Sequence, residues 1–265
     1  MILFLLLAGC GDKDETDPAS SSTDPTTSFE ADTDTDTDTD TDTDTDTDTD
    51  TDTDTDTDTD TDTDTDTKPD FVVEGDCGVL DKAALQDGTA SLLETVMTVT
   101  GKPDKSDLSA GGAEILAEGN LGGSSIYSEI YAFEVLNACE SAVLLKTEAE
   151  IVYDDAGGKK TDLLVEMYGL PVGVSVTRAY HYPPEDDYTV EEAEALLSDK
   201  LADVLVSADN AADKDEWARS ALHVIAYNSQ YAESVVTAWG KLDAKVRDET
   251  IVILTVSEGD DGFLY

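Results

Sequence analysis

Cationic and metal-binding side chains are scarce in this sequence of 265 residues. It has 15 Lys and Arg residues against 62 Asp and Glu, a formal net charge of −47, with only two His and three Cys. Nucleic-acid binding draws much of its affinity from Lys and Arg that displace counterions, so this charge balance makes nucleic acid an unexpected partner. Two His exclude a histidine-rich metal site. The sequence also lacks a Cys-x-x-Cys pair, a phosphate-binding glycine loop, a dinucleotide-binding glycine motif and a Gly-x-Ser-x-Gly elbow.

Apolar side chains are absent from residues 32–67, where Thr and Asp alternate. Such a tract buries nothing that offsets the entropy cost of ordering its backbone. Neighbouring Asp carboxylates lie within the roughly 8 Å Debye length of physiological salt, so they repel and extend the chain. Its upper reach is roughly 115 Å. We therefore expect residues 10–67 to form a disordered linker that acts as a spacer.

The chain begins with an apolar run, residues 1–8, which is too short to span a bilayer. The sequence Leu7-Ala8-Gly9-Cys10 that follows resembles the lipobox of bacterial lipoproteins. The resemblance implies that residues 1–9 are a signal peptide, that lipid is attached to Cys10, and that Cys10 becomes the new N-terminus. It implies an exported protein of the cell envelope whose membrane partner is bound through that lipid. Gly11, in place of the Asp associated with inner-membrane retention, favours the outer membrane.

Two further cysteines, Cys77 and Cys139, lie 62 positions apart. In an exported chain they are candidates for a disulfide, which would stabilise the fold by roughly 4 kcal/mol on the loop-entropy model. Two buried free thiols are the alternative, and the sequence leaves both open.

Residues 68–265 carry 38 acidic and 14 basic side chains and are numerous enough for one domain with a proper core. We expect an N-terminal extension over 68–125, with a helix at 85–99 that ends at Gly101 and Pro103. In 126–265 we expect a helix, a three-stranded meander, a helix opened by a Thr189–Glu192 capping box, a strand, a helix and a strand. The expected ranges are helix 126–139, strands 148–153, 162–168 and 172–177, strand 221–227, helix 229–242 and strand 250–256. This order predicts an α/β (α+β) domain with a mixed central sheet flanked by helices.

This order of elements resembles the core of the restriction-endonuclease-like, PD-(D/E)xK, superfamily. In that family an Asp opens the second strand and Glu-x-Lys lies on the third, and the two carboxylates hold Mg²⁺. Asp162 matches the first position, whereas Ser175 and Thr177 stand where the resemblance places the Glu and the Lys. The site is therefore expected to be degenerate, since hydroxyls are poor replacements for a carboxylate on a hard cation.

Two neighbouring charged residues bear on this site. Glu166 shares the strand face of Asp162 and is either a second carboxylate for a metal or a salt-bridge partner at the core. Arg178 follows Thr177, and strand alternation sends its side chain to the opposite face. We expect no cofactor; Mg²⁺ or Mn²⁺ is implied only if Asp162 and Glu166 act in an enzyme.

The two histidines are the remaining candidates. His181 follows the third strand of the meander, where Arg178 and two Tyr make either a polar ligand pocket or a solvent-facing loop. His223 lies in an apolar strand, as a hydrogen-bonded sheet histidine or as a ligand-binding residue. Trp217 and Trp239 are expected in the core or at its rim.

Three functions follow from these observations. The first is a membrane-anchored lipoprotein with a non-catalytic binding or structural domain, whose partner is an envelope protein or a small ligand. The second is a divalent-metal-dependent nuclease or related hydrolase that uses Asp162 and Glu166 with Ser175, Thr177 or Arg178. The third is an adhesion or calcium-responsive surface protein in which the Thr-Asp tract is the functional part.

Overall fold

The computed structural model describes residues 71–119 and 126–265. The chain divides into two units, 1–61 and 62–265, and only the second contains described residues. The expected signal peptide, the lipidation site Cys10 and the linker 10–67 lie outside the described residues.

One seven-stranded sheet forms the centre of the described unit, in the spatial order β1-β2-β7-β6-β5-β4-β3. Strands β2, β7, β6 and β5 are mutually parallel, β4 is antiparallel to both of its neighbours, and β1 is antiparallel to β2. The expectation of a mixed sheet is confirmed. The strands are β1 Val72–Gly75, β2 Ser91–Val99, β3 Val143–Thr147, β4 Leu163–Met167, β5 Leu170–Ala179, β6 Arg219–Ala226 and β7 Ile251–Gly259.

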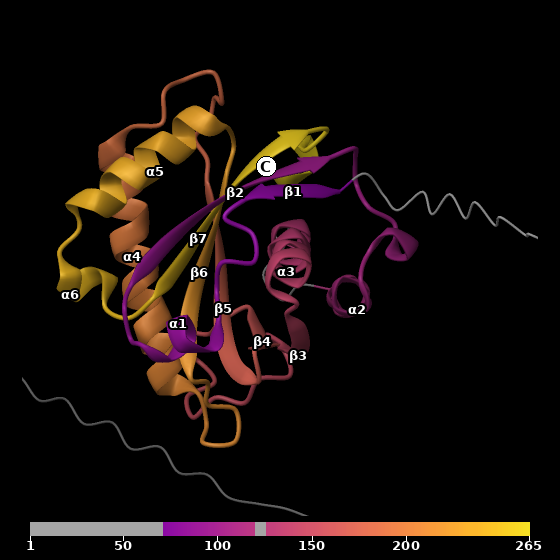
Figure 1. The fold of residues 1–265 in the computed structure, drawn as a ribbon, viewed down its shortest axis with the longest axis vertical. Coiled ribbons are helices and arrows are strands. Elements are labelled where there is room, and N and C mark those ends of the chain that lie inside the picture. Colours follow the sequence, from indigo (N-terminus) through magenta and orange to yellow (C-terminus); the bar gives the residue numbers. More distant parts are fainter. Residues whose placement is uncertain (1–70, 120–125) are drawn as a thin grey trace, which may run out of the picture. The chain divides into compact units, whose positions relative to one another are not determined.

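Helices cover both faces of the sheet (Figure 1). On one face lie α2 and α3, and on the other lie α4, α5 and α6. Each face has its own apolar core, one centred on α4 and α5 and the other on α3. The helices are α1 Lys82–Gln86, α2 Ala110–Glu118, α3 Ile126–Glu140, α4 Val190–Asn210, α5 Ser229–Lys241 and α6 Ala244–Arg247, with short 3₁₀ turns at Lys105–Asp107 and Gly262–Leu264. None of the helices among the described residues is long and apolar enough to cross a membrane.

Strand β5 follows the expected alternation. Val172 and Val174 are buried in the core beneath α3, with Val176 packed against it. Gly173, on the other face, makes room for an indole ring, because a Cβ there would lie 2.4 Å from the ring of Trp217. Trp239 belongs to the core under α5, so one tryptophan lies in the core and the other at its rim.

The start of α4 is also confirmed. Thr189 accepts a hydrogen bond from the amide of Glu192 at 3.2 Å, and the Glu192 carboxylate accepts one from the Thr189 amide at 2.8 Å. This reciprocal capping box satisfies two amides that a helix start leaves unpaired. It fixes the position at which the chain turns from β5 into α4.

Two of the expected elements are wrong. Residues 85–99 form only the end of α1 and then the whole of β2, separated at Gly88, whose φ of +72° suits glycine. The β-branched residues late in this segment favour a strand, and β2 pairs with β7 along its full length. Residues 148–153 are turns and bends, and the meander begins one segment earlier, at β3. The buried Asp215 carboxylate accepts from the Val152 amide at 2.7 Å and fixes this connection.

Strands β1 and β2 extend the same sheet as β3 to β7. Residues 68–125 and residues 126–265, which we expected to be an extension and a core, therefore both contribute strands to one sheet.

The structure pairs Cys77 with Cys139 in a disulfide, which resolves the alternatives that the sequence left open. The bond joins the segment after β1 to the last turn of α3. Next to it, the Glu140 carboxylate accepts from the Gly78 amide at 3.0 Å and from the Tyr168 hydroxyl at 2.8 Å.

We predict that the double substitution Cys77→Ala/Cys139→Ala lowers the free energy of unfolding by about 4 kcal/mol, because the closed loop no longer restricts the unfolded chain. Urea denaturation of the variant and of the wild-type chain measures the difference. A reducing agent should bring the wild-type chain to the same stability and leave the variant unchanged. Equal stability of the oxidised wild-type chain and the variant would contradict this prediction.

Candidate functional site

Asp162 lies immediately before β4 and sets its pairing with β5. Its carboxylate accepts a hydrogen bond from the Val176 amide at 2.6 Å, and its own amide donates to the Val174 carbonyl oxygen at 3.1 Å. The carboxylate thus takes the place of a backbone acceptor where the ladder ends. This contact fixes the carboxyl group beside the middle of β5.

Burial raises the pKa of the Asp162 carboxyl group to about 6, because desolvation disfavours the charged form. The hydrogen bond from Val176 opposes this shift. The nearby Glu148 raises the pKa further, and Lys200 lowers it. Asp162 therefore changes its charge near neutral pH, unlike an ordinary surface aspartate.

The Asp162 carboxyl group borders a cavity of about 120 Å³, which we call the Asp162 pocket. Helix α3 supplies two residues from its first turn, and β5 supplies three consecutive residues. The lining residues are Ser128, Glu129, Asp162, Val176, Thr177 and Arg178. Carboxylates, hydroxyls and a guanidinium group thus surround one small space.

The expected site residues converge only in part. Thr177 and Arg178 both line the pocket with Asp162. Strand alternation is kept, because Arg178 shares the face of Val174 and Val176 beneath α3 and Thr177 lies on the other face. The Ser175 hydroxyl instead pairs with the Thr161 hydroxyl at 3.1 Å. Glu166 is exposed, lies opposite Pro171 and Val143 in the sheet, and does not line the pocket.

Two pocket residues escaped the sequence analysis, Ser128 and Glu129 of α3. Both are buried, at 2% and 6% exposure. The spacing of apolar residues in α3 predicts which face of the helix packs against the sheet. It does not predict that the polar residues beside this face are buried as well. Buried residues lie on all sides of α3, and Ser128 and Glu129 are among them.

The Ser128 hydroxyl is a buried group for which the described residues provide no hydrogen-bond partner. Most buried hydroxyls are hydrogen-bonded, since an unpaired one costs free energy. Arg178 donates a hydrogen bond to the Leu264 carbonyl oxygen, which holds its guanidinium group near the C-terminal residues.

The two histidines lie elsewhere. His181 pairs with Glu192 at 2.9 Å, so the loop after β5 is tied to the capping box of α4. His223 is fully buried in β6, where its Nε2 lies 2.7 Å from the Thr255 hydroxyl, which in turn lies 2.7 Å from that of Thr95. Burial lowers the His223 pKa to about 3, so the ring is neutral. It is the hydrogen-bonded sheet histidine that the sequence analysis offered as one alternative.

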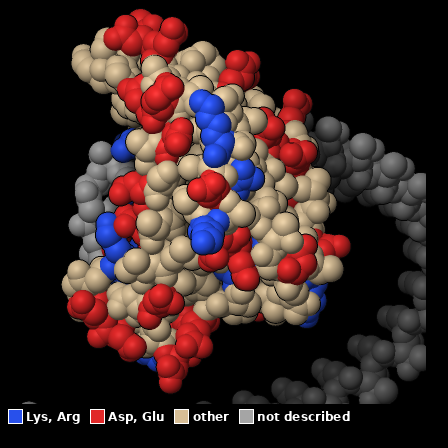
Figure 2. Space-filling model, turned by 90° about the vertical axis from the view of Figure 1, so that its left-hand side faces the viewer, with Lys and Arg blue, Asp and Glu red and all other residues tan. Residues whose placement is uncertain are grey.

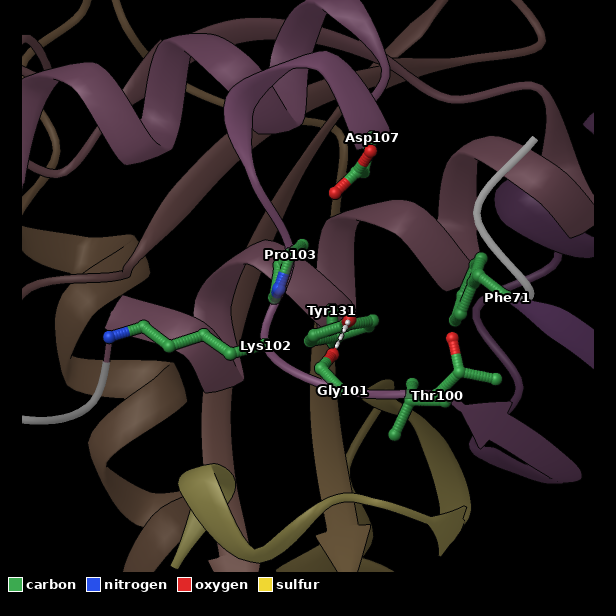
Figure 3. Close-up of a pocket in the computed structure, with 8 residues that line it drawn as sticks. Phe71, Thr100, Gly101, Lys102, Pro103, Asp107 and Tyr131 are labelled. Atoms are coloured by element: carbon green, nitrogen blue, oxygen red, sulfur yellow. Dashed lines mark hydrogen bonds between the residues drawn. The ribbon is translucent and has the colours of Figure 1, made fainter. Parts of the chain in front are cut away.

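A second cavity, of about 100 Å³, opens beside the end of β2 (Figure 3). The Tyr131 hydroxyl donates to the Gly101 carbonyl oxygen at 3.3 Å, and burial and nearby carboxylates raise the Tyr131 pKa to about 12. The Asp107 carboxylate accepts from the Asp104 amide at 2.7 Å, and the Lys102 ammonium lies 4.5 Å from the centre of the Tyr127 ring. These polar groups are therefore engaged within the protein, and this cavity offers less to a ligand than the Asp162 pocket.

Surface charge disfavours a polyanionic partner on the face that carries α4, α5 and α6. Figure 2 shows Asp and Glu side chains gathered at both ends of this face, with a narrower group of Lys and Arg side chains at its middle. A duplex laid across this face would meet acidic groups on either side of the basic ones, and like charges repel.

The Asp162 pocket fits a resident divalent metal poorly. The described residues contain no group of three or more His, Cys, Asp or Glu side chains arranged to hold a metal ion. Asp162 and Glu129 supply two carboxylates, and the adjacent Arg178 adds a positive charge that repels a cation. Mg²⁺ sites are built from carboxylates, water and substrate phosphates rather than from hydroxyls beside a guanidinium group.

One similar protein comes from comparison with known sequences. It is a Dictyostelium discoideum protein described as "AAC-rich mRNA clone AAC4 protein", 35% identical over 195 residues. The match covers 70% of this chain and 28% of the relative, so the chain spans less than a third of that protein's length. No protein-family description matches the sequence, and no solved structure matches it.

We predict that Asp162→Asn alters stability in a way that depends on pH. The wild-type carboxyl group has a raised pKa in the folded protein, so the penalty for burying its charge is small at pH 4 and increases as the pH rises to about 6. Asn carries no charge and keeps an oxygen for the Val176 amide. Relative to the wild-type chain, the variant should gain about 1–3 kcal/mol of stability between pH 4 and pH 8.

Urea denaturation of both proteins at pH 4 and pH 8 measures this difference. Both retain His223, whose own titration therefore cancels. Glu166→Gln, which removes an exposed carboxylate on β4, is the control and should show little pH-dependent difference. The same stability difference for Asp162→Asn at both pH values would show that the carboxyl group is not desolvated as the structure indicates.

Proposed function

We propose that this protein is a lipid-anchored module of the cell envelope that binds a small ligand through the Asp162 pocket, on a nuclease-like scaffold without nuclease catalysis. The observation that carries this proposal is the composition of the pocket. The residues Arg178, Thr177 and the buried Ser128 line the same cavity as Asp162. A guanidinium group beside a hydroxyl that has no partner among the described residues suits recognition of a polar molecule better than coordination of a catalytic metal.

The scaffold part of the proposal rests on the order of elements. Helix α3, the antiparallel meander β3-β4-β5, helix α4 and strand β6 follow one another as the resemblance to the PD-(D/E)xK core requires. Asp162 directly precedes the second strand of the meander, and Ser175 and Thr177 lie on the third. The shared fold would then hold the pocket in place, while the residues that line it could differ from those of the nucleases.

The anchoring part rests on Leu7-Ala8-Gly9-Cys10 and on the tract that follows it. One acyl chain gives marginal membrane residence and two or more give stable anchoring, so a multiply acylated Cys10 would hold the protein at a bilayer. The Cys77–Cys139 disulfide supports an oxidising compartment outside the cytoplasm. The proposed location is the outer membrane, with the repelling Thr-Asp tract as a spacer.

A divalent-metal hydrolase is the second candidate, and one observation favours it. Glu129 of α3 lines the pocket beside Asp162, so a second carboxylate is present there. It is not Glu166, the residue that the sequence indicated as the second carboxylate. In this reading the two carboxylates would hold Mg²⁺ or Mn²⁺, which would supply an activated water. The Arg178 charge and the acidic surface weigh against it.

We predict that radiolabelled palmitate fed to the expressing bacterium labels the full chain, and that Cys10→Ala abolishes the label because it removes the acceptor sulfur. Denaturing gel electrophoresis with autoradiography measures the label, and Glu166→Gln, which leaves Cys10 and the disulfide intact, is the control. Failure of the wild-type chain to take up palmitate would refute the anchor.

We further predict that the full chain does not cleave DNA or RNA in the presence of MgCl₂ or MnCl₂, because the pocket lacks a carboxylate set that holds either metal. Gel assays of cleavage, run beside a metal-dependent nuclease, test this. Cleavage that requires Mn²⁺ and is lost in Asp162→Ala but kept in Glu166→Ala would establish the hydrolase instead.

A further inference from the structure

Charges of opposite sign face the Asp162 pocket without being paired to each other. Arg178 and Asp162 both line the cavity, yet none of the ion pairs found among the described residues includes either of them. Arg178 has its hydrogen bond to the Leu264 carbonyl oxygen, and Asp162 has its bond from the Val176 amide. Neither of these contacts is an ion pair.

Charged groups at a partly buried cavity are stabilised when a ligand of opposite charge pairs with them. A carboxylate suits Arg178, because a guanidinium group presents a planar set of donors that matches two carboxylate oxygens. A positively charged ammonium group suits Asp162, whose ionised carboxylate only accepts hydrogen bonds. The pocket thus presents complementary sites for two opposite charges.

A third observation points to a ligand independently of these charges. The Ser128 hydroxyl, 2% exposed, lines the same cavity and lacks a hydrogen-bond partner among the described residues. A polar molecule in the cavity would supply that partner.

We propose that the Asp162 pocket binds a small zwitterion, a free α-amino acid, with its carboxylate on Arg178, its ammonium group on Asp162 and a hydrogen bond to Ser128. This inference names the ligand of the binding function proposed above and rests on it. Both charges are required together, since either one alone would leave the opposite group of the protein unpaired.

The size of the pocket restricts the ligand further. Its volume is about 120 Å³. Drug-sized ligands occupy pockets of about 300–1,000 Å³. The space therefore selects amino acids with short side chains, such as glycine, alanine and serine.

Isothermal titration calorimetry of the purified full chain tests the proposal with glycine, L-alanine and L-serine at pH 8, where Asp162 is ionised. Propionate, which lacks the ammonium group, and ethanolamine, which lacks the carboxylate, are the singly charged controls. We expect saturable binding of at least one amino acid, at least tenfold tighter than binding of either control. No saturable binding of any of the three, or equal binding of the controls, would overturn the proposal.

Variants locate the binding site. Asp162→Asn and Arg178→Gln should each weaken binding at least tenfold, and Glu166→Gln, on the same strand as Asp162 but outside the pocket, should leave it unchanged. Ser128→Ala removes a hydroxyl that has no partner in the described structure, so the variant should fold normally while binding weakens several-fold. Undiminished binding by the folded Ser128→Ala and Asp162→Asn variants would overturn the proposed site.

Titration of the full chain with MnCl₂ distinguishes the zwitterion site from the divalent-metal hydrolase. Binding of Mn²⁺ in place of amino acids, lost in Asp162→Asn, would overturn the zwitterion site and favour the hydrolase. Palmitate labelling of Cys10 tests the anchor without reference to the pocket, so a failed titration with intact labelling refutes the ligand alone.

Discussion

The burial of α3 is the constraint on which the rest of this structure depends. The helix packs its apolar side chains Ile130, Phe133 and Leu136 against the sheet, while its remaining faces are covered as well. A helix covered on all sides must find partners for every polar side chain it carries, because buried polar groups without hydrogen bonds cost free energy. Glu134 meets this requirement by accepting from the amide and the hydroxyl of Ser109 at 2.9 and 2.8 Å, which ties α2 to α3.

The two ends of α3 differ in how their buried polar groups are paired. At its last turn, the Cys139 disulfide and the Glu140 carboxylate secure the segment that follows β1, so this end is closed by contacts within the protein. At its first turn, Ser128 and Glu129 face the cavity beside Asp162, and the Ser128 hydroxyl lacks a partner among the described residues. One end of the helix is therefore a structural clamp and the other borders a space suited to a ligand.

Short sequence patterns correctly predicted those helices and strands that are determined by residues close together in the chain. The capping box at Thr189 and the alternation of Val172, Val174 and Val176 correctly placed α4 and β5, because caps and alternation depend on neighbouring residues. The apolar spacing of residues 85–99 suits a helix, whereas pairing with β7, about 160 residues away in the chain, makes most of them a strand. The site was predicted in part for the same reason. Asp162 directly precedes β4 and Thr177 lies on the adjacent strand β5, but the contributions of Ser128 and Glu129 depend on how α3 packs, which no local pattern reports.

We propose that the pocket between the first turn of α3 and the end of the β4–β5 ladder holds a polar ligand rather than a catalytic metal. X-ray diffraction from crystals of the protein soaked in MnCl₂, recorded at the manganese absorption edge, tests it most directly. We expect no anomalous peak within coordination distance of the Asp162 and Glu129 carboxylates, because the Arg178 guanidinium group opposes a cation there. A strong peak bridging those two carboxylates would contradict it.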